Sequence, residues 1–321
     1  ADLICLDIAY FYIGQLQFET ALVFLLRGVE FNAKNTDLLF ELAFCYEQLA
    51  KFEEAIQTYQ RIIDINAFSS EAWFNLGQIY FGRNDYVNAL EAYDYACSIN
   101  PDDMLALLQK GHTLFQMGLY TMALDCYLDY NDTISDSQSS IFIAECFEKM
   151  EDFKSALMYY KLAVEYDPES FDGLCGAAVC LLELESYAES IEYAEKALRI
   201  DENASDAWVY LAEGLIGIDD SDNALFAYLK SVSIDPEQPD ALMSIANICM
   251  EKGQFEIALE YYSEALKQDP ELEYVHLFMA VAYYKTEAYE QSKEMLREAI
   301  SRSAEAENLF YELCPEATKN N

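Results

Sequence analysis

Positive charge is scarce in this chain, which has 19 Lys and Arg residues against 58 Asp and Glu residues in 321 positions. The formal net charge of −39 argues against nucleic acid or an anionic membrane surface as a direct partner, because both would repel an acidic protein. It permits a basic partner. An equally good interpretation is that the charge keeps a large exposed surface soluble.

Histidine is also nearly absent, and no arrangement of residues points to catalysis. The two histidines, His112 and His276, lie far apart in the sequence. The segment Gly111–Gly118 lacks the Lys-Ser/Thr pair that completes a phosphate-binding loop. Cys175 and Cys180 are five residues apart and therefore do not share a helical face, as metal ligands would. We predict a protein without enzymatic activity, cofactor or metal site.

Long apolar runs are missing too. No run reaches the roughly 18–20 residues that span a membrane. Residues 1–14 are apolar, but no basic region precedes them, so we assign them to a helix rather than to a signal peptide. The chain begins with alanine, which suggests processing or a piece of a longer protein. We expect a cytoplasmic protein, or a periplasmic one if an upstream signal was removed.

Cysteine is more plentiful, with nine residues, an odd number. Most of them fall within apolar helical patterns, where cysteine behaves as a small hydrophobic residue. We therefore predict reduced, buried thiols, whereas disulfides would require a secreted or periplasmic setting.

The stretch 70–103 contains the pattern that the rest of the chain repeats. Apolar residues recur at helical spacing over 72–82 and again over 86–98, with a polar turn between them. Pro101 ends the second pattern because proline lacks the N–H that a helix interior needs. The stretch is predicted to form a helical hairpin of 34 residues.

This hairpin resembles the tetratricopeptide repeat position by position, at Trp73, Leu76, Gly77, Tyr80, Ala89, Tyr93, Ala96 and Pro101. If Trp73 takes position four, the same register gives nine units: 2–35, 36–69, 70–103, 104–136, 137–170, 171–204, 205–238, 239–272 and 273–304. The resemblance implies an all-α fold, an α-solenoid of stacked hairpins in a right-handed superhelix. We expect one array over 1–314, with a C-terminal capping helix at 304–313 and a tail at 315–321.

Two positions of the repeat support this register because they stay small. Position eight is alanine or glycine in all nine units, and position twenty is alanine or serine. The two positions would face each other across a hairpin, where a larger side chain would overpack the contact by about 1–3 kcal/mol.

Two units depart from the pattern. The unit 104–136 is one residue short and runs into a polar, turn-forming segment at 131–140. We expect a shortened second helix there, or a flexible joint between two half-arrays. The unit 2–35 is unusually apolar for a terminal repeat. We expect an upstream unit or a second subunit to cover it.

The resemblance also implies a binding surface, because the first helices of such repeats line a concave groove. The predicted peptide-binding residues are Phe40, Glu41, Phe44, Phe74, Asn75, Gln78, Phe81, Gln109, His112 and Phe115. In this family the groove positions are two, five, six, nine, twelve and thirteen of each repeat. In this chain they hold many aromatic and acidic residues but only Lys149 and Lys285 as bases. The cationic clamp that binds acidic chaperone tails in some family members is therefore missing. Some of the aromatic residues are expected to pack between neighbouring first helices instead.

The predicted function is that of a non-enzymatic protein–protein interaction scaffold. Its partner would be a peptide or protein segment with apolar anchors and basic charge, held in the groove. An alternative is the regulatory or targeting region of a larger enzyme, or a periplasmic assembly factor. Self-association through the apolar N-terminal end is a further hypothesis. Neither nucleic acid nor direct membrane insertion is expected.

Overall fold

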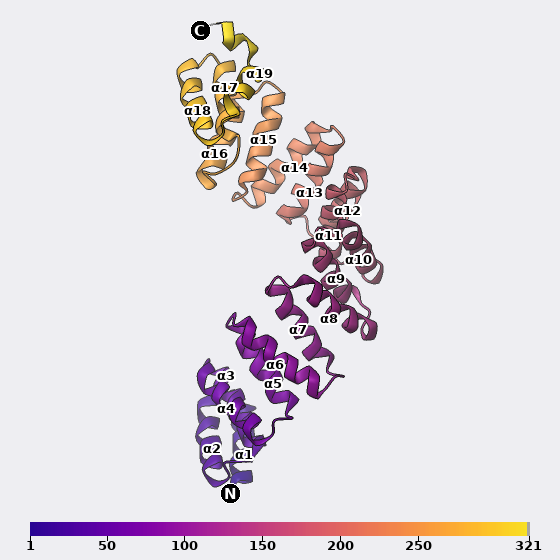
Figure 1. The fold of residues 1–321 in the computed structure, drawn as a ribbon, viewed down its shortest axis with the longest axis vertical. Helices are drawn as coiled ribbons and strands as arrows, with labels where there is room; N and C mark the ends of the chain where they lie inside the picture. Colours follow the sequence, from indigo (N-terminus) through magenta and orange to yellow (C-terminus); the bar gives the residue numbers. More distant parts are fainter. Residues whose placement is uncertain (320–321) are drawn as a thin grey trace. The chain divides into compact units, whose positions relative to one another are not determined.

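The computed structural model describes residues 1–319, and this range contains 19 α-helices and one 3-10 helix but no strand (Figure 1). The chain divides into an N-terminal unit, Ala1–Asp152, and a C-terminal unit that begins at Phe153. The helices of the N-terminal unit are α1 (Asp2–Ile13), α2 (Phe18–Phe31), α3 (Thr36–Gln48), α4 (Phe52–Ile65), α5 (Ser70–Gly82), α6 (Tyr86–Ile99), α7 (Met104–Gln116), α8 (Tyr120–Thr133) and α9 (Ser137–Lys149).

The C-terminal unit continues in the same way. Its elements are α10 (Phe153–Tyr166), α11 (Phe171–Glu183), α12 (Tyr187–Ile200), α13 (Ser205–Gly217), α14 (Ser221–Ile234), α15 (Pro239–Glu251), α16 (Phe255–Gln268), α17 (Val275–Lys285), α18 (Tyr289–Arg302), α19 (Ala306–Leu313) and the 3-10 helix η1 (Pro315–Lys319). In both units, successive helices pair as antiparallel hairpins that stack on their neighbours. The predicted all-α solenoid fold is confirmed.

Short polar side chains start several of the first helices. The Asn35 side chain accepts hydrogen bonds from two backbone N–H groups of α3, and Asp103 accepts one from the N–H of Ala106 at 3.0 Å. Such caps satisfy donors that have no partner inside the helix. A left-handed residue then makes each turn inside a hairpin, at position fifteen of every repeat: Leu16, Ala50, Asn84, Gly118, Glu151, Glu185, Asp219, Gly253 and Glu287.

Small residues let the two helices of a hairpin approach closely. Ala9 and Ala21 are fully buried where α1 meets α2. Where position twenty is a serine, its hydroxyl donates to the carbonyl of position eight: Ser190 to Ala178 at 3.0 Å, and Ser292 to Ala280 at 2.8 Å. The serines therefore fit the same contact as alanine because their one polar group is satisfied.

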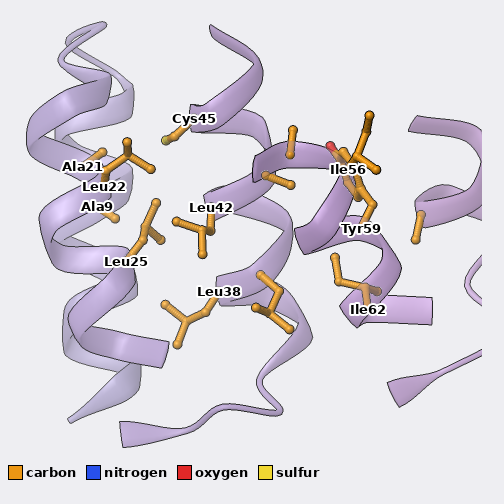
Figure 2. Packing of buried hydrophobic residues seen from close by; sticks show 14 of the residues in the cluster. Ala9, Ala21, Leu22, Leu25, Leu38, Leu42, Cys45, Ile56, Tyr59 and Ile62 are labelled. Atoms are coloured by element: carbon orange, nitrogen blue, oxygen red, sulfur yellow. The ribbon is translucent and has the colours of Figure 1, made fainter. Parts of the chain in front are cut away.

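Larger apolar side chains hold neighbouring hairpins together. Figure 2 shows Leu22 and Leu25 of α2 pointing towards Leu38 and Leu42 of α3, and all four are buried. One hairpin cannot bury this face alone, so the core is continuous from hairpin to hairpin within a unit.

The irregular fourth repeat corrects one expectation. Its second helix, α8, has 14 residues, the same length as α4 and α6, so the predicted shortening is wrong. The repeat is one residue short because the loop between α8 and α9 is one residue shorter than the loop between α6 and α7. Asp136 closes the shorter loop through a capping box with Ser139, whose N–H donates to the Asp136 carboxylate at 2.7 Å. A tight cap thus replaces one residue of loop. The flexible joint stays a prediction.

At the C-terminal end, α19 packs on α17 and α18. Ala306, Phe310 and Cys314 are buried there against Leu277 and other apolar residues. The segment predicted as a tail begins with η1, while residues 320–321 lie outside the described range.

A methyl group added at position eight of the third hairpin should test the close helix contact. A Cβ at Gly77 would lie 2.7 Å from Cε1 of the Tyr93 ring, whereas one at Gly82 would have no neighbour within 4 Å. We expect Gly77→Ala to lower the free energy of unfolding by about 1–3 kcal/mol. Gly82→Ala, the matched control, should leave stability unchanged or raise it by up to about 1 kcal/mol. Urea unfolding followed by circular dichroism measures both, and equal stabilities would contradict the packing argument.

Candidate functional site

The ten predicted binding residues come from three first helices of the N-terminal unit. α3 carries Phe40, Glu41 and Phe44; α5 carries Phe74, Asn75, Gln78 and Phe81; α7 carries Gln109, His112 and Phe115. We call this set the first-helix surface. Phe44 and Gln78 are exposed, and the other eight residues are half-buried.

A row of buried tyrosines from the second helices lies against the first-helix surface. In the N-terminal unit these are Tyr59, Tyr93 and Tyr127, all at position twenty-four. The Tyr59 ring meets Phe40 edge-on at 6.1 Å, and the Tyr93 ring lies 5.8 Å from Phe74. The tyrosines therefore pack against the aromatic candidates on the side that faces the second helices.

The hydroxyl groups of these tyrosines reach the polar candidates. Tyr59 donates to the Glu47 carboxylate at 2.5 Å and shares a hydrogen bond with Asn75 of the following hairpin. The Tyr93 hydroxyl is buried and has no hydrogen-bond partner among the described residues. Asn75 is thus oriented by the core as well as partly open to solvent.

His112 is held in an aromatic cluster. Its Nδ1 lies 2.7 Å from the Tyr127 hydroxyl, and its ring meets Phe142 of α9 edge-on at 4.7 Å. Burial lowers the pKa of His112, which keeps the ring neutral at neutral pH. The residue supports α7 against α9 and does not supply a positive charge for an acidic ligand.

Aromatic packing separates the phenylalanine candidates into two groups. Phe81 and Phe115 lie edge-on against Tyr86 and Tyr120, which begin the second helix of the same hairpin, at 5.5 and 5.3 Å. Phe44 is 38% exposed, although one edge contacts Phe18. Phe44 therefore offers the most accessible aromatic anchor of the set.

Carboxylates crowd one another beside Phe44. Burial raises the pKa of Glu41, a hydrogen bond from the Tyr10 hydroxyl opposes this, and the nearby Glu71 and Asp37 raise the pKa further. The groove positions of α1, α3, α5 and α7 carry no Lys or Arg. The potential at this place is accordingly negative, and a cation would relieve the repulsion.

The C-terminal unit repeats these features. The Tyr262 hydroxyl donates to Asn247 Oδ1 at 2.5 Å, and the Tyr262 ring stacks on Phe278 at 6.1 Å. Burial raises the pKa of Glu213, with Glu183 and Asp240 adding to the shift. Position twenty-four is a tyrosine in six of the nine hairpins and includes Tyr93 of the repeat pattern, but sequence reasoning missed that these tyrosines pack against the binding candidates.

Other kinds of site find little support in residues 1–319. These residues contain no group of three His, Cys, Asp or Glu side chains that could hold a metal. Within them, no helix combines the length and the apolar character required to cross a membrane. Burial raises the pKa of the Cys45, Cys146 and Cys175 thiols to about 12, which leaves them unreactive at neutral pH.

Two cavities lie near the C-terminal end of the chain. One of about 410 Å³ is lined by Tyr274, His276 and Arg302 among others, and one of about 460 Å³ by Tyr284, Phe310 and neighbouring residues. None of the ten residues of the first-helix surface lines either cavity.

Four family models match the chain, and each describes a tetratricopeptide repeat. One matches residues 70–103 and 239–272, and the others match 147–207, 37–69 and 274–305. Together they cover more than half of the sequence. No curated protein matches the chain.

Solved structures resemble the fold. A tetratricopeptide repeat protein from Parabacteroides merdae has a TM-score of 0.58 at 16% identity, over 76% of this chain and 97% of its own. The APC/C hetero-tetramer Cut9–Hcn1 has a TM-score of 0.56 at 14% identity, and the match covers 83% of this chain and 52% of that chain. YrrB, described as a TPR protein with an unusual peptide-binding site, has a TM-score of 0.51 at 20% identity, and the match covers 59% of this chain and 97% of that chain. At these identities the likeness concerns the fold alone.

Removing single hydroxyl groups from the tyrosine row should separate structural bonds from spare ones. We expect Tyr127→Phe to lower the free energy of unfolding by about 1–2 kcal/mol, because half-buried His112 loses its partner. Tyr93→Phe should change stability by close to zero, since the hydroxyl it removes has no partner. Thermal unfolding of the two variants checks this, and an equal loss in both would contradict it.

The pH dependence of stability should reveal the crowded carboxylates. A raised pKa means that the folded state binds a Glu41 proton more tightly than the unfolded state does. The contribution of Glu41 to stability therefore falls as pH rises from its ordinary value of 4.5 through the raised value. We expect Glu41→Gln to be more stable than wild type at neutral pH, with the difference vanishing under acidic conditions. Unfolding midpoints across this range measure the effect, and a pH-independent difference would contradict it.

Proposed function

Because the chain belongs to the tetratricopeptide repeat family, we propose that it is a protein-interaction scaffold that binds a peptide or protein segment along the first-helix surface. The surface extends over three successive first helices of the N-terminal unit. An extended or helical segment is the kind of ligand that can follow such a row of helices.

The observation that carries the proposal is the accessible Phe44 ring beside three mutually repelling carboxylates, Glu41, Asp37 and Glu71. An apolar side chain of the ligand would pack on Phe44, and a Lys or Arg next to it would neutralise the carboxylates. Aromatic anchors of this kind commonly dominate the energy of an interface. The ligand class is therefore a segment with apolar anchors and basic charge.

Further support comes from the polar candidates. Asn75 is fixed by its bond to Tyr59, and Gln78 is exposed one helical turn further along α5. Side-chain amides can donate to and accept from the main chain of a ligand. YrrB, a protein of similar fold, is described as having a peptide-binding site, but at 20% identity its residues do not transfer to this chain.

The proposal assigns no catalytic step to the chain. Burial keeps three thiols protonated, those of Cys45, Cys146 and Cys175. The Nδ1 atom of His112 is hydrogen-bonded to the Tyr127 hydroxyl. A scaffold role requires only that the first-helix surface keep its shape while a ligand binds.

A peptide-display selection on the immobilised chain would test the proposal. We expect enriched peptides to combine apolar residues with Lys or Arg, and to bind Phe44→Ala about tenfold more weakly than wild type. Glu41→Gln should weaken binding of the basic peptides and reduce its salt dependence. Fluorescence anisotropy with the selected peptides gives the dissociation constants.

The matched control is Phe68→Ala, which removes an 80%-exposed phenylalanine from the loop between α4 and α5. Its affinity should equal that of wild type. Peptides that bind all variants equally, or a selection without basic residues, would refute the proposed surface and ligand class respectively.

A further inference from the structure

The cavity of about 460 Å³ near the C-terminal end is lined by four aromatic side chains: Tyr284 of α17, Tyr289 of α18, and Phe310 and Tyr311 of α19. Phe310 is 4% exposed and Tyr289 is 46% exposed, so the cavity has one deeply buried aromatic wall and one that solvent reaches. Its volume lies within the range of small-molecule sites, about 300–1,000 Å³. We call this space the aromatic cavity.

The aromatic cavity exists because the capping helix is short. α19 has 8 residues, five fewer than the 13 of α15, and Pro315 follows it. Where a first helix has its full length, its last turn fills the equivalent place. A Cβ added at Gly217, at the end of α13, would clash with the ring of Tyr187, which begins the second helix of the preceding hairpin. Tyr289 has the same place in its own hairpin as Tyr187, and it lines the cavity instead.

The chain itself bounds the aromatic cavity on the side where a further hairpin would enter. Ala317 of η1 lines the cavity beside the two rings of α19. α19 is fixed there because Phe310 and Cys314 are buried against apolar residues of α17 and α18. The occupant is therefore a small molecule or a single side chain, and not another helix.

The orientations of the rings indicate the shape and charge of that occupant. The Tyr284 ring makes an angle of 61° with Tyr289 at 5.4 Å and of 87° with Phe310 at 5.9 Å. Phe310 and Tyr311 are inclined by 76° at 5.6 Å. A flat ligand would need parallel rings to stack on, whereas inclined rings surround a compact group. Because the face of an aromatic ring is negative, a compact group with a positive charge fits such walls best.

We propose that the aromatic cavity binds an alkylammonium group, with a trimethylammonium group as the best fit. The other polar groups of the lining are already engaged. The Ser292 hydroxyl donates to the Ala280 carbonyl at 2.8 Å, and the Lys293 ammonium lies 3.2 Å from the Glu290 carboxylate. A quaternary ammonium group carries a charge but no N–H, so it is recognised without a hydrogen-bond partner.

Charge favours this ligand over an anion. Lys293 is the single base among the lining residues, and Glu290 neutralises it. The Glu290 side chain is 87% exposed, so its carboxylate can also turn towards a bound cation. The net charge of −39 further attracts cations and repels anions.

Titration calorimetry of the 321-residue chain with choline tests the proposal. The matched control ligand is the neutral analogue of choline in which a carbon atom replaces the charged nitrogen. The two molecules have nearly the same shape and differ in charge. We expect choline to bind at least about tenfold more tightly than the neutral analogue. Equal affinities, or no saturable binding of choline, would overturn the proposal.

Variants of the exposed walls locate the site. We expect Tyr289→Leu and Tyr311→Leu each to weaken choline binding by about fivefold or more, because leucine keeps apolar bulk but has no aromatic face. Tyr289→Phe keeps the face and should bind as wild type does. Tyr166→Leu removes a tyrosine that is 49% exposed in α10, away from the cavity, and should have no effect. Circular dichroism checks that each variant folds, and choline affinities that do not change in either cavity variant would overturn the assignment.

A second ligand distinguishes the two sources of such a group. Acetylated trimethyllysine amide represents a methylated side chain of a protein, and choline represents a free small molecule. The tighter binder of the two identifies the source, and both share the proposed chemistry. Phe44→Ala, which weakens the proposed peptide site, should bind choline as wild type does. The two proposals can therefore fail independently, since no residue of the first-helix surface lines the aromatic cavity.

Discussion

The packing of each first helix onto the preceding hairpin is the contact on which the rest of the structure depends. Within a hairpin, small residues such as Ala9 and Ala21 let the two helices approach closely, and aromatic pairs such as Phe74 and Tyr93 add contact between them. The large side chains, such as Leu25 and Leu38, are buried only when a neighbour is present. Stability is therefore shared between adjacent hairpins, as in other repeat proteins.

The tyrosine row connects this packing to the candidate binding surface. Tyr59 lies in the core of one hairpin, yet its hydroxyl bonds both to Glu47 of that hairpin and to Asn75 of the next. The contact that holds two hairpins together thus also fixes the orientation of a polar residue at the surface. Tyr127 does the same through His112, which in turn touches Phe142 of the following hairpin. Such bonds reduce the side-chain entropy that a ligand would otherwise have to remove on binding.

Much of the fold could be predicted because the repeat pattern is local. The expected helices over 72–82 and 86–98 correspond to α5 and α6, and positions eight and twenty meet as expected where Ser190 donates to Ala178 and Ser292 to Ala280. The left-handed turn residues escaped prediction, since Leu16 and Ala50 have no intrinsic preference for that conformation and adopt it because the hairpin requires it. The length of α8 was also not predicted. The fourth repeat is one residue short, and the sequence does not show whether that residue is missing from the helix or, as the structure has it, from the loop that the capping box closes.

The candidate site was harder to predict because the repeat register assigns positions but not exposure. Register alone gives Phe44 and Phe81 the same standing. The structure distinguishes them, because Phe44 is exposed whereas Phe81 is half-buried, although each ring has one aromatic neighbour, Phe18 for Phe44 and Tyr86 for Phe81. How much of each ring is accessible depends on the packing of all its surroundings, which the register does not give.

Acidity limits what the first-helix surface can bind. Carboxylates surround the accessible Phe44 ring, so another acidic surface placed on that ring would bring like charges together. The same carboxylates favour a ligand that places a cation beside its apolar side chain. The position of the carboxylates around the ring, rather than their number in the chain, therefore determines the class of ligand that the proposed site would accept.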